Sequence, residues 1–321
     1  MKKLLSIGLA AMLAFGLATT SFAEEAGDVT TPTDGTVTIH KVYKLENADT
    51  TSPAETFTLV QDGDGKVTDG EATEAPALGT ITGATYEEGA ATVSGTTGDI
   101  TVALPEYTNV GVYEYTLKEV DGKTAGVVYY PDDIKLVVTV INGENGKLRI
   151  AAVHVESEGE KSDTFPNTYK AGELDVSKTV TGNLGDKNKY FEFKVTLTGE
   201  EGKTYRDSYA VTGGSNTENP STIKIGEETT FLLKHGDTIT IANLPYGVTY
   251  TVTETAAEGY TTEKTGDTGK INAADQAAEF TNNKAGSIDT GVVLNNMPYI
   301  LVLAVLAAGV AVFIIRKRRE D

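Results

Sequence analysis

The chain has 321 residues, no cysteine and a formal net charge of −19. An acidic balance of this size argues against nucleic acid or an anionic lipid surface as a partner. The absence of cysteine excludes disulfides, so a cross-link in this chain must come from other side chains, and the lysines become the residues of interest.

The N-terminus has the three parts of a secretory signal. Lys2 and Lys3 precede an apolar run over residues 4–17, and Ser21-Phe22-Ala23 supplies a small-x-Ala cleavage site. We therefore predict a signal peptide over residues 1–23 and an exported protein that begins near Glu24. Export would place the folded part outside the cell.

The sequence of the exported part predicts β-structure throughout. Apolar and polar residues alternate in the segments 36–43, 113–120, 134–141, 173–180, 191–198 and 248–254. Turn signals such as Asp62-Gly63-Asp64-Gly65 and Asn142-Gly143 separate these segments. No long amphipathic helical period lies between the two chain ends. The sequence predicts an all-β fold of β-sandwich type.

The exported part also repeats itself. Residues 101–105 and 115–119 are echoed by 240–247 and 250–254, residues 37–41 match 174–178, and residues 165–167 match 280–282. Each half thus offers a lysine, a glutamate and an asparagine in the same order. We expect two domains, over residues 24–169 and 170–284, with an insertion late in the first.

The C-terminal segment, residues 285–321, carries a second targeting signal. Thr290-Gly291 is followed by an apolar stretch densest over residues 297–315, long enough for a membrane helix, and then by Arg316-Lys317-Arg318-Arg319. This pattern resembles the Leu-Pro-x-Thr-Gly sorting signal, with Ser287 and Ile288 where Leu and Pro are usual. The resemblance implies cleavage by a sortase between Thr290 and Gly291. The alternative is an ordinary C-terminal membrane anchor.

Residues 244–255, followed by Glu258-Gly259-Tyr260, resemble the signature of the collagen-adhesin B-type domain, an inverse-immunoglobulin-like β-sandwich. Two tandem domains of this kind between a signal peptide and a sorting signal resemble a major pilin subunit of Gram-positive sortase-assembled pili, of the streptococcal isopeptide-pilin type. The resemblance implies a structural shaft subunit with no enzymatic turnover. The alternative is a monomeric adhesin or stalk that a sortase attaches singly to the cell wall.

The resemblance also implies one intramolecular isopeptide bond per domain. On an alternating strand a lysine in phase with aliphatic residues is buried with them, and burial favours its neutral, nucleophilic form. A neighbouring carboxyl would polarise the asparagine carbonyl and shuttle protons. Lys44 and Glu114 are second choices on the opposite faces of their strands. By resemblance the cross-linked pairs are Lys41–Asn167 and Lys178–Asn282, and the catalytic carboxyls are Glu119 and Glu254.

Polymerisation needs an acceptor lysine that attacks the acyl-enzyme formed at Thr290. In the resembling pilins it lies late in the first domain, which favours Lys161, with Lys170 as the runner-up. The partners implied are a sortase, neighbouring copies in a head-to-tail fibre, peptidoglycan, and possible tip or base pilins, at the wall-anchored cell surface.

Two weaker patterns predict no site. Asp62-Gly63-Asp64-Gly65 does not continue with the EF-hand spacing, and we interpret it as a plain turn. His40, His154 and His235 are scattered among predicted strands without cysteine partners. We expect no cofactor and no metal site.

Overall fold

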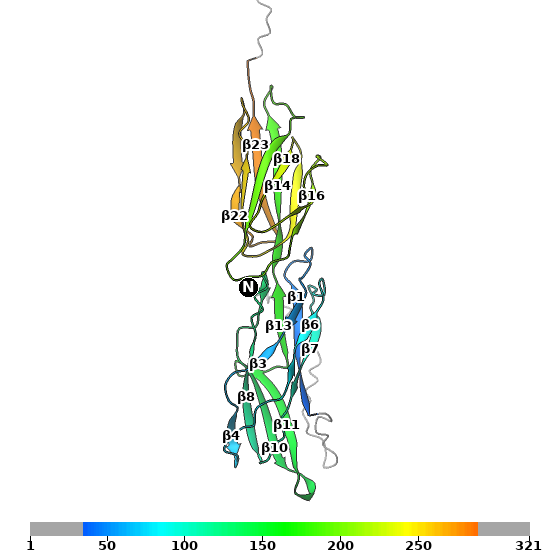
Figure 1. Ribbon diagram of the computed structural model, residues 1–321, viewed down its shortest axis with the longest axis vertical. Coiled ribbons are helices and arrows are strands. Elements are labelled where there is room, and N and C mark those ends of the chain that lie inside the picture. The colour runs from blue at the N-terminus through cyan, green and yellow to red at the C-terminus, as the bar shows by residue number, and fades with distance from the viewer. Residues whose placement is uncertain (1–34, 288–321) are drawn as a thin grey trace, which may run out of the picture.

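The computed structural model describes residues 35–287 (Figure 1). The predicted signal peptide, Thr290, Gly291 and the predicted membrane helix lie outside these residues. Within residues 35–287, we find no helix with the length and apolar character needed to cross a bilayer. The described part is all-β, as predicted, apart from one 3₁₀ turn, η1 (Glu144–Gly146).

The strands form two units that lie end to end along the long axis of the molecule (Figure 1). In the first unit one sheet has the order β5 (Ile81–Thr82), β7 (Thr96–Ala103), β1 (Thr36–Leu45), β13 (Thr164–Tyr169) and β9 (Val127–Val128). The other has the order β12 (Glu160–Lys161), β11 (Leu148–Ser157), β10 (Ile134–Asn142), β8 (Gly111–Glu119) and β3 (Leu59–Gln61), with β4 (Lys66–Gly70) also paired to β8. A small ribbon joins β2 (Glu55–Phe57) and β6 (Ala84–Tyr86).

The second unit repeats the two-sheet plan. Its larger sheet has the order β17 (Thr222–Ile223), β16 (Tyr209–Gly213), β19 (Thr238–Pro245), β14 (Ala171–Thr181), β23 (Asp275–Asn283) and β21 (Thr261–Thr265). Its smaller sheet has the order β18 (Glu228–Leu233), β15 (Phe191–Thr198), β20 (Thr249–Glu254) and β22 (Thr268–Lys270). Each unit encloses its own hydrophobic core.

The first and last strands of each unit are parallel neighbours. β1 pairs with β13 and β14 pairs with β23, whereas the other named strand pairs are antiparallel. Parallel pairing of a unit's two terminal strands requires the chain to leave at the end opposite to where it entered. Such a unit can be joined end to end with another, as the two units of this chain are (Figure 1).

Alternation along the terminal strands decides which residues enter the cores. Ile39 and Tyr43 are fully buried in the first unit, and Leu174 and Val176 in the second, in phase with one lysine on each strand. In the first core Tyr43, Phe57 and Tyr86 pack edge to face with centroid distances of 5.0–5.6 Å. Such pairs add to the apolar burial that stabilises the core.

The two units differ mainly late in the first. Glu119 and Asn167 are 48 residues apart, whereas Glu254 and Asn282 are 28 residues apart. Between the first two residues the chain forms the antiparallel hairpin of β10 and β11 and the short β12. The insertion predicted from the repeat therefore supplies an outer hairpin, and it contains Lys161.

The junction between the units is held by direct hydrogen bonds. The amide of Asn243 bonds both the N–H and the carbonyl of Thr51, at 3.0 and 2.9 Å, and Asn243 itself has a positive φ of 61°. Arg206 donates to Glu88 and to the carbonyl of Thr51. Because β13 runs into β14 with only Lys170 between them, little free chain separates the units.

Candidate cross-link sites

The structure brings the three residue types together in the first unit. Lys41 lies on β1, Glu119 ends β8 and Asn167 lies on β13. The Lys41 amine donates to Glu119 Oε2 at 2.9 Å, and Asn167 Nδ2 donates to Glu119 Oε1 at 2.7 Å. One carboxyl therefore contacts both residues that a cross-link would join.

The second unit repeats this geometry. The Lys178 amine lies 2.9 and 2.8 Å from the two carboxyl oxygens of Glu254, and Asn282 Nδ2 donates to Glu254 Oε1 at 2.5 Å. Lys178 lies on β14, Glu254 ends β20 and Asn282 lies on β23. Both groups draw on the first and last strands of a unit and on one strand of the facing sheet.

The strand register is the same at both sites. Lys41 pairs with Phe165 and Tyr43 with Asn167, while Lys178 pairs with Phe280 and Val180 with Asn282. In each unit the asparagine thus lies two residues beyond the position opposite the lysine, on the same face of the sheet. Because of this offset, the lysine and asparagine side chains of each site are diagonal neighbours on adjacent strands.

Burial dominates the electrostatics of both sites. The side chains of Lys41, Glu119, Lys178 and Glu254 are at most 3% exposed. Burial lowers the pKa of Lys41 and of Lys178 below the ordinary value of 10.5, although the glutamate beside each lysine opposes the shift. The sites therefore favour the neutral amine more than water does.

The asparagine carbonyl is the remaining polar group. Within the described part of the chain, the buried Oδ1 atoms of Asn167 and Asn282 have no hydrogen-bond partner. A buried carbonyl oxygen without a donor is costly and needs an explanation. Both orphaned oxygens belong to the amide groups that the cross-linking hypothesis marks as electrophiles.

Several residues that line the sites were not among the predicted site residues. The rings of Phe191 and Phe193 lie 4.5 and 5.7 Å from the Lys178 amine, and Tyr130 lies 5.6 Å from that of Lys41. The Tyr130 N–H donates to Glu119 Oε2 at 3.0 Å. The alternation around Phe191 and Phe193 could have indicated inward rings, but not their distance from Lys178.

The second-choice residues lie away from the sites. Lys44 is half-buried on the other face of β1, and the Glu114 carboxylate lies 3.5 Å from the Lys135 amine. Neither contacts Asn167 by a hydrogen bond in the described structure.

The two acceptor candidates have different surroundings. Lys161 is exposed on β12, and its amine forms no hydrogen bond or ion pair with any residue from 35 to 287. Lys170 lies between the units with its amine 3.8 Å from a Glu46 carboxylate oxygen. The structure does not describe Thr290 and Gly291.

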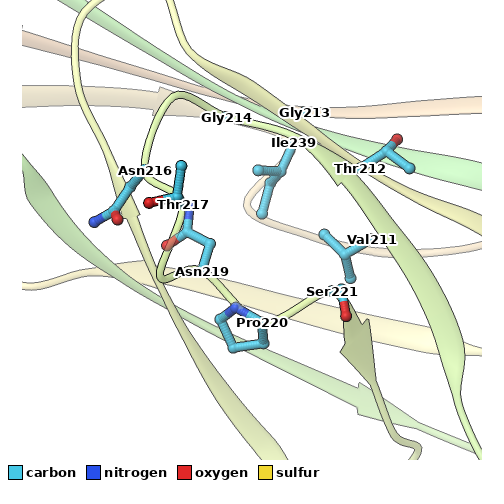
Figure 2. A pocket seen from close by; sticks show the side chains of 10 residues that line it. All are labelled: Val211, Thr212, Gly213, Gly214, Asn216, Thr217, Asn219, Pro220, Ser221 and Ile239. Atoms are coloured by element: carbon cyan, nitrogen blue, oxygen red, sulfur yellow. The ribbon is translucent and has the colours of Figure 1, made fainter.

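The remaining polar patterns form no comparable group. Over residues 35–287, no three His, Cys, Asp or Glu side chains are placed to hold a metal ion. Asp62 pairs with Lys118 at 2.7 Å, His40 with Asp99 at 2.7 Å, and His235 Nδ1 accepts the Val180 N–H. A pocket of about 240 Å³ lies beside the loop that joins β16 and β17, and no ionisable side chain lines it (Figure 2).

Comparisons with known proteins agree with this architecture. Residues 37–170 match the Spy0128-like isopeptide containing domain, and residues 172–284 match a domain of unknown function, DUF7601. A curated pilin from Streptococcus pyogenes serotype M1 is 31% identical, covering 96% of this chain and 98% of its own. The pilus tip adhesin Cpa of Streptococcus pyogenes is 31% identical over 40% of this chain and 19% of its own.

Solved structures give the same picture. The crystal structure of the major pilin from Streptococcus pyogenes has a TM-score of 0.53 and 25% identity, covering 78% of this chain and 99% of its own. A mutant of that pilin has a TM-score of 0.54 and 26% identity over the same shares. The chain belongs to the pilin family of Gram-positive bacteria, whose members are structural subunits and not enzymes.

Proposed function

We propose that this pilin is a shaft subunit that cross-links itself and is then polymerised by a sortase. The observation that carries the first part is the duplicated group: a buried lysine, carboxyl and asparagine, in contact, at the same register in both units. Two independent cores would not each bury a lysine, a carboxyl and an asparagine together unless the group had a use, because removing an amine and a carboxyl from water costs free energy that their mutual attraction offsets only in part.

The proposed reaction is a transamidation, in which the lysine amine replaces the amide nitrogen of the asparagine. The neutral Nζ of Lys41 attacks Cγ of Asn167, the new C–N bond replaces the bond to Nδ2, and ammonia leaves. Glu119 takes the proton that the amine loses and returns one to the departing Nδ2, both of which lie within hydrogen-bond distance of its carboxyl. Lys178, Glu254 and Asn282 would react in the same way, once per molecule.

The Oδ1 atoms without hydrogen-bond partners are consistent with these reaction steps. A half-turn of the Asn side chain about χ2 exchanges Oδ1 and Nδ2, and would bring the carbonyl oxygen to the carboxyl. In its acid form that carboxyl would donate to Oδ1 and stabilise the charge that develops there during attack. The orientation in the structure, with Nδ2 on the carboxyl, suits departure of ammonia.

Polymerisation is the second part of the proposal. A sortase thiolate would attack the Thr290 carbonyl, release the Gly291 amine, and pass the acyl group to the amine of Lys161 on the next subunit. The exposed, unpaired amine of Lys161 favours it over Lys170, which has Glu46 beside it. Removal of residues 1–23 and retention of residues 285–321 at the membrane would precede this step. In the last subunit of the shaft, the Thr290 acyl group would be joined to peptidoglycan instead of to another Lys161.

The alternative is a subunit attached singly to the wall, and one experiment separates the two. We expect a wall extract to show a ladder of covalent multimers that Lys161→Ala removes and Lys170→Ala leaves intact. A single band from the wild type would favour the monomeric anchor. Loss of the ladder only in Lys170→Ala would move the acceptor to the junction.

The internal bonds have their own measurement. The folded protein, after signal removal, should weigh less than its sequence by two ammonia molecules, and its digest should contain peptides joined through Lys41–Asn167 and Lys178–Asn282. A protein at the full sequence mass would refute the cross-linking proposal while leaving the ladder experiment unaffected.

A further inference from the structure

The distal end of the second unit carries three lysines that have no ion-pair partner among residues 35–287. We define the tip as residues 182–190, 258–260 and 284–286. Lys187, Lys189 and Lys284 lie there, and within the described structure none of them has a carboxylate oxygen within 4.0 Å. Lys189 and Lys284 instead lie 5.3 and 5.2 Å from the ring of Tyr260. In a chain of net charge −19 this local excess of positive charge is unusual.

The three lysines outnumber the two carboxylates of the tip, Asp186 and Glu258, and leave a net charge of +1. The Asp186 carboxylate accepts the N–H of Asn188 at 2.9 Å. The tip also exposes apolar surface, since Leu184 is 51% exposed. Lysines around an exposed leucine are suited to an acidic protein partner.

The tip holds the chain rigidly where it leaves the second unit. Asn183 bonds both the carbonyl and the N–H of Gly286, at 2.8 and 3.0 Å, and Leu184 N–H donates to the carbonyl of Lys284. Gly286 is therefore held within the tip. Thr290 follows four residues later, so its carbonyl lies within about 14 Å of Gly286 even in a fully extended chain.

The proposed acceptor lies in a hairpin of the opposite charge. We define the acceptor hairpin as residues 154–163. Glu158, Glu160 and Asp163 are exposed there around Lys161, and within the described residues none of their carboxylates has a lysine or arginine partner. Glu156 lies directly across the strand pair from Lys161. Only His154 lies near one of these carboxylates, at 3.7 Å from Glu156.

The turn of this hairpin retains a charged residue at a strained position. Glu158 and Gly159 have φ angles of 51° and 83°, as in a type I′ turn, where Asn, Asp or Gly is usually found before Gly. A glutamate in this left-handed region costs free energy that a smaller residue would avoid. A need for a carboxylate close to Lys161 would account for a glutamate at this strained position.

From these observations we propose that the tip of one subunit docks on the acceptor hairpin of the next copy of the same chain. The inference rests on the proposed polymerisation, because a Thr290–Lys161 bond holds Gly286 near the hairpin by a tether of four residues and one lysine side chain. This tether is longer than the screening length of about 8 Å at physiological salt, so the tip lysines and hairpin carboxylates attract each other where the tether brings them within that length. The contact would orient the acyl-enzyme toward Lys161.

A charge-swap experiment tests this docking in the full chain with its sortase. The tip variant Lys187→Glu/Lys189→Glu and the hairpin variant Glu158→Lys/Glu160→Lys should each slow growth of the ladder by about tenfold, a typical effect of lost electrostatic steering. A chain that carries both pairs of changes should regain the wild-type rate, because the charges again attract. The mass deficit of two ammonia molecules reports folding of every variant.

The controls separate this inference from the proposed function. Lys194→Glu/Lys224→Glu changes the net charge by the same amount as the tip variant, at one lysine on β15 and one just after β17, both outside the tip, and should leave the ladder unchanged. Wild-type rates in both single-sided variants, or failure of the combined variant to recover, would overturn the docking proposal. A ladder that persists in Lys161→Ala would instead overturn the acceptor assignment on which it rests.

Discussion

At the scale of single residues, the decisive property is the burial of a lysine beside a carboxyl that also contacts an amide. Burial lowers the pKa of Lys178, and Glu254 Oε1 contacts both the Lys178 amine and Asn282 Nδ2. In the proposed reaction, this carboxyl carries the proton from the amine to the departing ammonia. We therefore expect its loss to affect bond formation far more than folding.

We expect Glu254→Ala to prevent the Lys178–Asn282 bond while the protein stays folded. Intact mass should then fall short of the sequence by one ammonia molecule, from the first unit alone. Glu258→Ala, which alters an exposed carboxylate on the same unit, should retain both bonds. A Lys178–Asn282 peptide in the digest of Glu254→Ala would exclude Glu254 as the catalyst.

The unlinked lysine should also make stability depend on pH. In Glu254→Ala the folded state releases the Lys178 proton at a lower pH than the unfolded chain, whose lysine has the ordinary value near 10.5. The unfolded state then binds more protons, so the free energy of unfolding should rise as pH increases through the folded pKa toward 10.5. Denaturant titrations at several alkaline pH values should show this rise in Glu254→Ala but not in Glu254→Ala/Lys178→Met.

At the scale of elements, the parallel pairing of terminal strands would determine which asparagine takes part in the proposed cross-link. Asn282 is buried beside Val180, its partner on β14, whereas Asn283 is exposed because successive residues of a strand face opposite sides. A shift of one residue along β23 thus removes the amide from the site. If the proposed bond forms, its position would be specified by the strand register and not by the mere presence of an asparagine.

Asn282→Ala should therefore abolish the second bond although Asn283 remains next to it. Loss of a link that closes a loop of roughly 100 residues should lower the free energy of unfolding by about 4–5 kcal/mol on the chain-entropy model. Asn283→Ala should retain both the bond and the stability. Tryptic mapping and denaturant unfolding measure the two effects, and a Lys178–Asn283 peptide would contradict the argument from register.

The sequence predicted these elements well where the signal is local. Alternation in residues 37–41 and 174–178 indicated that Lys41 and Lys178 face inward, and both are buried. The repeat indicated the insertion that forms the β10–β11 hairpin. Local patterns could not predict the hydrogen bond from the Tyr130 N–H to Glu119 or the hydrogen bonds between Asn243 and Thr51. These contacts depend on segments that only the fold brings together.

At the scale of the whole molecule, the strand directions set the path that tension would follow. If the load enters at Lys161, it passes along β13 directly into β14, since only Lys170 separates the two strands. A Lys178–Asn282 bond would then transfer it to β23 and out toward Thr290. Lys41 lies on β1, beside this path and not on it.

The two internal bonds should therefore differ under force. Without the second bond, tension pulls β14 and β23 in opposite directions along their shared ladder, and the 103 residues between Lys178 and Asn282 can be extended once that ladder shears. Glu254→Ala should thus make shafts, or single subunits held at Lys161 and Thr290, extend in a single-molecule pulling experiment. Glu119→Ala should leave the extension at the wild-type value and lower only the thermal stability of the first unit, because the Lys41–Asn167 bond stabilises that unit without carrying the load. Equal extension in the two variants would mean that force enters the subunit upstream of β1, and not at Lys161.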